Sequence, residues 1–176
     1  TKPSININDV AILQYTGGTT GISKGAKLSH ANIVAHNSMI TEWFKPYMKP
    51  GVNNIMITAI PMYHIFALTT NGVLMFSTGV KNVLITNPKD MKGFVKELKK
   101  HKFTIITGVN TLFNGLLNNA DFKNLDFSHL HGAIAGGMAV QDVVARRWKE
   151  VTGTPLVEGY GLSETSPVLC CNPLDG

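Results

Sequence analysis

The segment of the sequence with the clearest chemical signature is rich in glycine and threonine. Residues 15–25 read YTGGTTGISKG. Glycines let the backbone approach a ligand and turn N–H groups toward an anion, and threonine hydroxyls and a lysine ammonium add donors. A flexible surface loop is the alternative, and this combination disfavours it. The pattern predicts a loop that binds the β- and γ-phosphates of a nucleotide through Thr16, Gly17, Gly18, Thr19, Thr20, Gly21 and Lys24.

This segment differs from the phosphate loop of the P-loop NTPases. Their template is G-x-x-x-x-G-K-[ST], whereas Lys24 is followed by Gly25 and the glycine spacing does not fit. The sequence therefore predicts a phosphate loop of another type.

A second glycine-containing segment, residues 158–165, reads EGYGLSET. It does not complete G-x-G-x-x-G, because Glu164 occupies the last position, and a dinucleotide fingerprint is thereby excluded. Tyr160, between two glycines, can stack on a base. The Ser163 hydroxyl beside the Glu164 carboxylate can hold a phosphate and Mg²⁺, which prefers carboxylate and phosphate oxygens. A plain surface role for Glu164 is the alternative.

Two further positions carry weaker signals. His64, in the run PMYHIFAL, is by residue type more often a hydrogen-bonded structural histidine than a catalytic one. Gly136, Gly137 and Met138 follow an apolar run, and their small residues would let a flat ring lie against the backbone. A tight turn between a strand and a helix explains these three residues equally well.

Apolar runs that alternate with helical patterns must position these segments. Strands are expected at 10–13, 55–60, 80–85, 103–107, 131–135 and 155–157, and a buried helix within 62–76. Helices are expected after Ser29, after Asp90, at 110–117 and at 140–151. This alternation predicts an α/β fold with a mostly parallel sheet flanked by helices, and such sheets bind ligands at the carboxyl ends of their strands.

Composition narrows the class of protein. Of 176 residues, 44% are hydrophobic and 15% charged, which indicates a globular chain. The net charge of +5 owes much to lysines at 96–102 that read as the solvated face of a helix, so no nucleic-acid partner is expected. Adjacent Cys170 and Cys171 predict free thiols and a reducing, cytoplasmic compartment. No apolar run is long enough for a membrane span.

Taken in order, these motifs resemble those of the adenylate-forming superfamily, which includes acyl-CoA synthetases, luciferases and peptide-synthetase adenylation domains. Residues 15–25 resemble its phosphate-loop signature, and residues 160–164, YGLSE, resemble its Tyr-Gly-x-Thr-Glu motif. The likeness extends across essentially the whole chain. Residues 61–68, 84–88, 107–113 and 158–164 together look most like bacterial long-chain fatty-acid–CoA ligases.

The resemblance implies roles for individual residues. Thr16 to Lys24 would hold the phosphates of ATP, Gly136, Gly137 and Met138 would border the adenine, and Tyr160 would stack on it. Ser163 would touch the α-phosphate, within a nucleotide-binding run that includes Glu158, Gly159 and Gly161. Glu164, with Thr16, would ligate Mg²⁺, and His64 would sit beside the acyl carboxylate. Phe66, Val109 and Phe113 would line an acyl tunnel. His64, Glu164 and Lys24 would be the catalytic groups.

The resemblance also implies the reaction and the domain organisation. Residues 1–176 would be an internal fragment of the AMP-binding domain, and the C-terminal domain with the catalytic lysine would lie outside it. The parent enzyme would use a long-chain fatty acid, ATP and CoA, whereas this fragment alone is expected not to turn over. Peripheral association with the inner face of the membrane and a homodimer are compatible with the parent.

Two other functions stay open. One is an adenylate-forming enzyme for another carboxylic acid, such as an aryl or amino acid. The other is a nucleotide-binding module without turnover.

Overall fold

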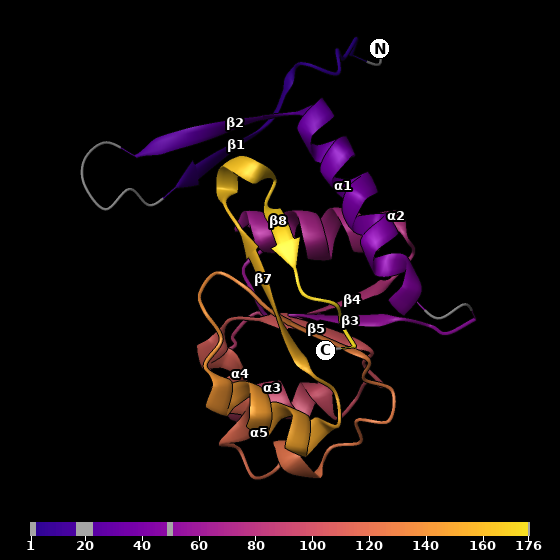
Figure 1. The fold of residues 1–176 in the computed structure, drawn as a ribbon, viewed down its shortest axis with the longest axis vertical. Coiled ribbons are helices and arrows are strands. Elements are labelled where there is room, and N and C mark those ends of the chain that lie inside the picture. The colour runs from indigo at the N-terminus through magenta and orange to yellow at the C-terminus, as the bar shows by residue number, and fades with distance from the viewer. Residues whose placement is uncertain (1–2, 17–22, 49–50, 176) are drawn as a thin grey trace.

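The computed structural model describes residues 3–16, 23–48 and 51–175. They form two sheets (Figure 1). A two-stranded antiparallel sheet consists of β1 (Val10–Thr16) and β2 (Lys24–Ser29). A six-stranded sheet has the order β4-β3-β5-β6-β7-β8. Its strands are β3 (Ile55–Thr58), β4 (Lys81–Leu84), β5 (Ile105–Gly108), β6 (Gly132–Ala135), β7 (Leu156–Gly161) and β8 (Val168–Cys171).

The six-stranded sheet is parallel from β4 to β7, and only β8 runs antiparallel to its neighbour. Because parallel strands need crossover connections, helices cover both faces of the sheet (Figure 1). One face is covered by α3 (Met91–Leu98), α4 (Asn110–Leu117) and α5 (Asp142–Thr152). The other is covered by α1 (His30–Phe44), the π-helix η2 (Ala67–Leu74) and the short α2 (Met75–Ser77). The expected α/β architecture is therefore confirmed.

Alternating strand residues separate the two hydrophobic cores. Ile57 and Ile106 belong to the core beneath α3, α4 and α5, which also contains Trp148. Met56 and Ile105, one residue earlier in each strand, belong to the core beneath α1 and η2. This alternation follows from the two-residue period of a strand, and apolar residues at successive positions are what a sheet covered on both faces requires.

The helices begin and end where local chemistry favours it. Ser29 caps α1: its hydroxyl accepts from the Asn32 N–H at 3.2 Å, and the Asn32 side chain accepts from the Ser29 N–H at 2.9 Å. The Asp90 carboxylate caps α3 by accepting from the Gly93 N–H at 3.0 Å. After α5, Gly153 adopts a φ of 76°, which suits glycine. Three 3₁₀ turns, η1 (Lys45–Tyr47), η3 (Phe122–Asn124) and η4 (Ser163–Thr165), complete the elements.

Three local expectations differ from the structure. The two ends of the loop expected at 15–25 are strand residues, because β1 ends at Thr16 and β2, which pairs with it, begins at Lys24. Residues 158–161 do not follow a strand but belong to β7, which pairs with the unexpected β8. The buried helix expected within 62–76 is π-helical at Ala67–Leu74, and Phe76 at its end is 88% exposed. In the described residues, every helix is too short or too polar to cross a membrane.

Candidate functional site

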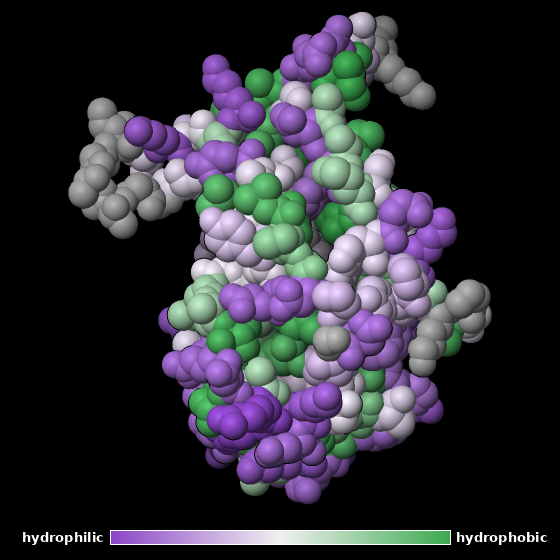
Figure 2. Space-filling model, viewed as in Figure 1, coloured by the Kyte–Doolittle hydropathy of each residue, from purple (hydrophilic) through white to green (hydrophobic). Residues whose placement is uncertain are grey.

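A cavity of about 680 Å³ opens where α1, η2 with the three residues before it, the end of β6, and the β7–β8 hairpin meet. Figure 2 shows hydrophobic surface gathered around β8 and α1, above a more hydrophilic region over α5. The lining brings together residues from all four segments singled out in the sequence: Thr16, His64, Gly136, Gly137, Gly159, Tyr160, Gly161, Ser163 and Glu164.

Other expected site residues do not line this cavity. Lys24 is exposed at the start of β2, Met138 is 49% exposed, and Glu158 lies half-buried in β7. Gly17, Gly18, Thr19, Thr20 and Gly21 fall outside the described residues.

The three residues expected to line an acyl tunnel do not all lie at this cavity. Phe66 lines the cavity, but Val109 and Phe113 do not. Phe113 is fully buried in the opposite core, where its ring centroid lies 4.8 Å from that of Trp148. An apolar residue such as Phe113 in a helix can face either side of the sheet, and sequence spacing alone does not distinguish the two sides.

The β7–β8 hairpin holds the 160–164 motif in a tight connection. Gly161 pairs with Val168, and η4, which contains Ser163 and Glu164, lies between them. The Leu162 N–H donates to the Pro167 carbonyl at 3.1 Å. Thr165 closes the turn from inside: its hydroxyl donates to the Leu162 carbonyl at 2.9 Å. Tyr160 is 58% exposed and borders the cavity, so its ring is available to a ligand.

His64 is held at the carboxyl end of β3 with one ring nitrogen occupied. Its Nδ1 accepts a hydrogen bond of 3.2 Å from the Phe66 N–H. In the neutral ring the proton then resides on Nε2, which is left as a donor. The turn is also tied to the two-stranded sheet, because Gln14 Nε2 donates to the Tyr63 carbonyl at 3.2 Å. This contact ties β1, which ends at Thr16, to the turn that contains His64.

Gly136 allows close packing at the cavity wall. A Cβ at this position would lie 2.9 Å from Phe66 Cε1 and 3.3 Å from the Gly159 carbonyl oxygen. Since real Cβ atoms are essentially never found below 3.0 Å, any larger residue would force the Phe66 ring to move. Its neighbour Gly137 has a φ of 79°, a backbone conformation that favours glycine.

Two parts of the lining were missed in the sequence. One is the face of α1 formed by His36, Met39, Ile40, Trp43 and Phe44. The sequence predicted a helix after Ser29 but gave it no part in the site. The other is β8 with the residue before it, which contributes Pro167, Val168, Leu169, Cys170 and Cys171. A four-residue strand after a proline leaves almost no periodicity to detect.

Burial shifts the pKa of two groups in the lining. It lowers the pKa of the His36 imidazole below its ordinary value of 6.5. It raises the pKa of the Cys171 thiol to about 11, with the neighbouring Cys170 thiol adding to the effect. Both cysteines are free thiols, as expected.

One carboxylate in the lining could bind a cation that arrives with its own ligands. Glu164 is the one carboxylate among the described lining residues, and the described chain contains no cluster of three or more histidine, cysteine or acidic side chains that could hold a metal. Mg²⁺ is commonly bound by one or two carboxylates together with phosphate oxygens and water. Glu164, with the Thr16 hydroxyl in the same lining, fits that mode.

Comparison with known proteins shows the family of the chain. Residues 1–176 match the model of the AMP-binding enzyme family. The chain is 54% identical over 174 residues to a long-chain-fatty-acid–CoA ligase of Escherichia coli O157:H7, covering 99% of this chain and 31% of that protein. It is 51% identical over 176 residues to the Haemophilus influenzae ligase of the same name, again covering 99% of this chain and 31% of the relative.

A solved structure gives the same result for the fold. The crystal structure of ATP-bound MatB from Rhodopseudomonas palustris superimposes with a TM-score of 0.80 at 27% identity, covering 97% of this chain and 32% of that one. The chain thus spans about a third of the length of these proteins. From the family match over its entire length, the chain belongs to the AMP-binding enzymes.

Proposed function

We propose that this chain is the nucleotide- and acyl-binding part of a long-chain fatty-acid–CoA ligase. In the whole enzyme, a fatty-acid carboxylate attacks the α-phosphorus of ATP, giving acyl-adenylate and pyrophosphate. The thiol of CoA then attacks the acyl carbonyl, giving acyl-CoA and AMP. The identity of 51–54% to bacterial ligases of that name supports the choice of reaction.

The observation that carries the proposal is the mixed lining of one cavity. Hydroxyl, carboxylate and glycine residues from three separate segments share it with a wall of large apolar side chains: Met39, Ile40, Trp43, Phe44 and Phe66. Its volume of about 680 Å³ falls among ligand pockets, which span roughly 300–1,000 Å³. A nucleotide needs the first kind of lining and a hydrocarbon chain needs the second.

The chain's own residues would bind and orient the two substrates. Thr16 and Ser163 would donate hydroxyl hydrogen bonds to phosphate oxygens, and Tyr160 would offer its exposed ring to the adenine. His64, with Nδ1 occupied by the Phe66 N–H, would donate from Nε2 to the acyl carboxylate and orient it toward the α-phosphorus.

Further parts of the proposal concern groups from outside this chain. Mg²⁺, held by Glu164 and Thr16 with the nucleotide, would neutralise phosphate charge. The MatB structure contains bound ATP, and this supports ATP as the nucleotide here. The catalytic lysine would come from a C-terminal domain outside residues 1–176. We place the whole enzyme in the cytoplasm, with peripheral association at the membrane and a homodimer as further proposals to test.

Binding tests the proposal most directly. The protein is heated with non-hydrolysable acyl-adenylate analogues that carry palmitoyl, acetyl or benzoyl groups, since a ligand that binds only the folded state raises the melting temperature. We expect the palmitoyl analogue to give the largest increase. A larger increase with benzoyl or acetyl would favour an enzyme for a small acid, and no increase with any analogue would contradict acyl-adenylate binding by these residues.

Turnover separates an enzyme part from a binding module. Pyrophosphate release from palmitate and MgATP is expected from the full-length protein and not from residues 1–176 alone. Release by the fragment would contradict the proposal that the catalytic lysine lies outside it. Substitution of Lys24 and Glu164 in the full-length protein should abolish adenylation. Unchanged turnover in those variants would argue against their proposed roles.

A further inference from the structure

Helix α1 has one face toward the cavity and another away from it. The cavity side is formed by His36, Met39, Ile40, Trp43 and Phe44, at the i, i+3, i+4, i+7, i+8 spacing of a helical stripe. Four of these five side chains are apolar. His36 is the exception and begins the stripe.

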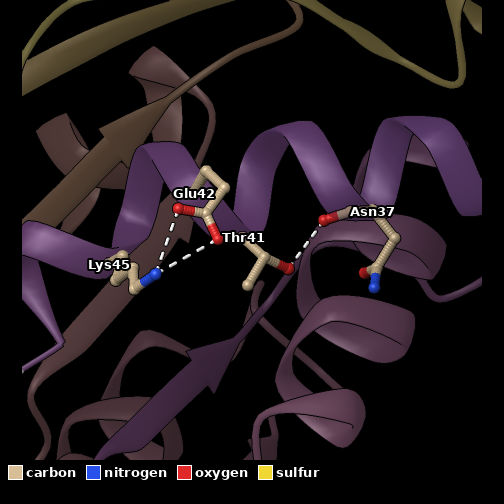
Figure 3. A network of polar contacts seen from close by, with 4 residues as sticks. All are labelled: Asn37, Thr41, Glu42 and Lys45. Carbon is tan, nitrogen blue, oxygen red and sulfur yellow. Dashed lines mark hydrogen bonds and ion pairs between the residues drawn. The ribbon is translucent and has the colours of Figure 1, made fainter.

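Away from the cavity, α1 makes polar contacts between neighbouring turns (Figure 3), and Asn37 Nδ2 also donates to Ser77 Oγ at 3.3 Å. Thr41 Oγ1 donates to the Asn37 carbonyl at 2.6 Å, and Lys45 pairs with Glu42 at 3.2 Å with both side chains 71% exposed. None of these four residues lines the cavity. Polar contacts on this face therefore provide a comparison for those of His36.

His36 makes a long-range hydrogen bond that the rest of the stripe does not. Its ring is 3% exposed, and Nε2 accepts from the Val168 N–H at 3.0 Å, across 132 residues of sequence. A ring nitrogen can accept only while it is unprotonated, and burial favours the neutral ring. Among the described residues Nδ1 has no partner, so the bond to Val168 is the ring's one hydrogen bond there.

Val168 occupies a sensitive position in the site. It begins β8 and pairs with Gly161, the last residue of β7. Between them lies η4 with Ser163 and Glu164. The side-chain hydrogen bonds within this turn come from Thr165 and stay inside it. In the described part of the chain, His36 supplies the side-chain hydrogen bond that joins this hairpin to α1.

We infer that His36 is a positioning residue that couples the apolar wall of the cavity to the turn carrying Ser163 and Glu164. The inference rests on the proposed function. An acyl chain packed against Ile40, Trp43 and Phe44 restrains α1, and the hydrogen bond from Val168 to His36 transmits that restraint to the hairpin. Coupling between two ligands is reciprocal, so a bound fatty acid strengthens nucleotide binding and a bound nucleotide strengthens fatty-acid binding by the same factor.

Three variants of the full-length protein test the coupling. His36→Leu keeps apolar bulk but lacks an acceptor, whereas His36→Gln retains an amide oxygen that can accept from Val168. Thr41→Val removes a hydrogen bond within the same helix at a residue that does not line the cavity, and it serves as the matched control. The measured quantity is the dissociation constant of α,β-methylene-ATP with and without palmitate, a pair of ligands that allows no turnover.

We expect palmitate to tighten nucleotide binding about fivefold or more in the wild type and in Thr41→Val, within the usual range for coupled sites. The factor should fall to near one in His36→Leu and be largely restored in His36→Gln. Hydrogen exchange of the Val168 amide should accelerate in His36→Leu alone. A purely structural role would instead lower the melting temperature and leave the palmitate factor unchanged.

Two results would overturn the inference: a wild-type palmitate factor of one, or a factor in His36→Leu equal to that in Thr41→Val. Either outcome is separate from the proposed function, because acyl-adenylate formation by the wild type is measured independently. A wild type that forms acyl-adenylate without coupling would refute only the role of His36. A wild type that shows coupling without forming acyl-adenylate would refute only the reaction.

Discussion

Asn71 Nδ2 lies 2.7 Å from Thr107 Oγ1, and this hydrogen bond joins η2 to the centre of the sheet. The same amide group donates to Thr58 Oγ1 at 2.8 Å, and Thr58 donates in turn to Asn82 Oδ1 at 2.6 Å. Asn71, Thr58 and Thr107 are almost completely buried. The network therefore links η2 to β3, β4 and β5, and it fixes the helix from which Thr70 reaches the cavity.

Replacing Asn71 should destabilise the fold. Asn71→Leu has a similar volume but leaves the Thr107 hydroxyl without its donor and buries it in an apolar setting. We expect a loss of about 1–3 kcal/mol in the free energy of unfolding, measured by urea denaturation. Asn37→Leu is the control, because its bond to Ser77 is at 3.3 Å and exposed. Equal losses in the two variants would contradict a special role for the buried network.

Two glycines in β7 should respond differently to alanine. At Gly161 an added Cβ would overlap the carbonyl oxygen of Pro167 and lie 2.8 Å from its carbonyl carbon, both backbone atoms that cannot move aside cheaply. At Gly159 the nearest atom would be Cys171 Sγ at 3.6 Å, an ordinary contact. We expect Gly161→Ala to lower the melting temperature by several degrees, and Gly159→Ala to change it little.

The result can be checked by differential scanning calorimetry of both variants. Both Gly159 and Gly161 line the cavity, so the two variants are compared by melting temperature and not by ligand binding. Equal melting temperatures for the two variants would show that the β7–β8 connection can relax around Gly161.

The adjacent cysteines should differ in reactivity. Cys170 is exposed and lies opposite Tyr160 in the β7–β8 ladder. The thiol of Cys171, with its pKa raised to about 11, is roughly one part in a thousand thiolate at pH 8. We expect one fast and one slow phase with iodoacetamide, followed by mass spectrometry. Cys170→Ser should abolish the fast phase and Cys171→Ser should retain it; the reverse pattern would contradict the burial of Cys171.

Stability should depend on pH through His36. Burial lowers the pKa of this imidazole in the folded state, so below pH 6.5 the unfolded chain binds a proton that the native ring resists. The stability that the neutral His36 ring contributes is fully present above pH 6.5. It declines as the pH falls toward the lowered pKa, by at most about 1.4 kcal/mol per pH unit. The difference in unfolding free energy between wild type and His36→Leu should therefore shrink from pH 8 to pH 5.

Urea denaturation at several pH values measures this difference. The other titratable side chains of the cavity occur in both proteins and cancel to first order: His64, Tyr160, Glu164, Cys170 and Cys171. A difference that stays constant over this range would mean that His36 titrates normally in the native state.

Local patterns predicted much of the fold. The helix expected at 110–117 has these bounds in the structure, and Ser29 and Asp90 cap α1 and α3 as predicted. Capping and amphipathic spacing are local, so they can be read from a single sequence. The β2 and β8 strands were missed because each is held by a partner strand through backbone hydrogen bonds, and neither shows a clear apolar alternation.

The candidate site was predicted in part for a related reason. The rule that ligands bind at the carboxyl ends of parallel strands correctly grouped His64, Gly136 and Gly137, which follow β3 and β6. It does not explain Thr16, which reaches the cavity from a separate antiparallel sheet. Which residues of α1 line the cavity depends on the elements that the helix packs against. That Lys24 and Glu158 lie outside the lining depends on the directions of their side chains. Neither kind of information is local.

The π-helical geometry of Ala67–Leu74 has a consequence for variation in chain length. A π-helix closes its hydrogen bonds over one more residue than an α-helix. Deleting one residue here can therefore convert the segment to α-helix while β3 and β4 keep their places. The residues beyond the deletion would then keep their faces, whereas deleting one residue from an α-helix would turn them by about 100° around its axis. A one-residue deletion here would thus leave the wall of the cavity and the sheet beneath it largely unchanged.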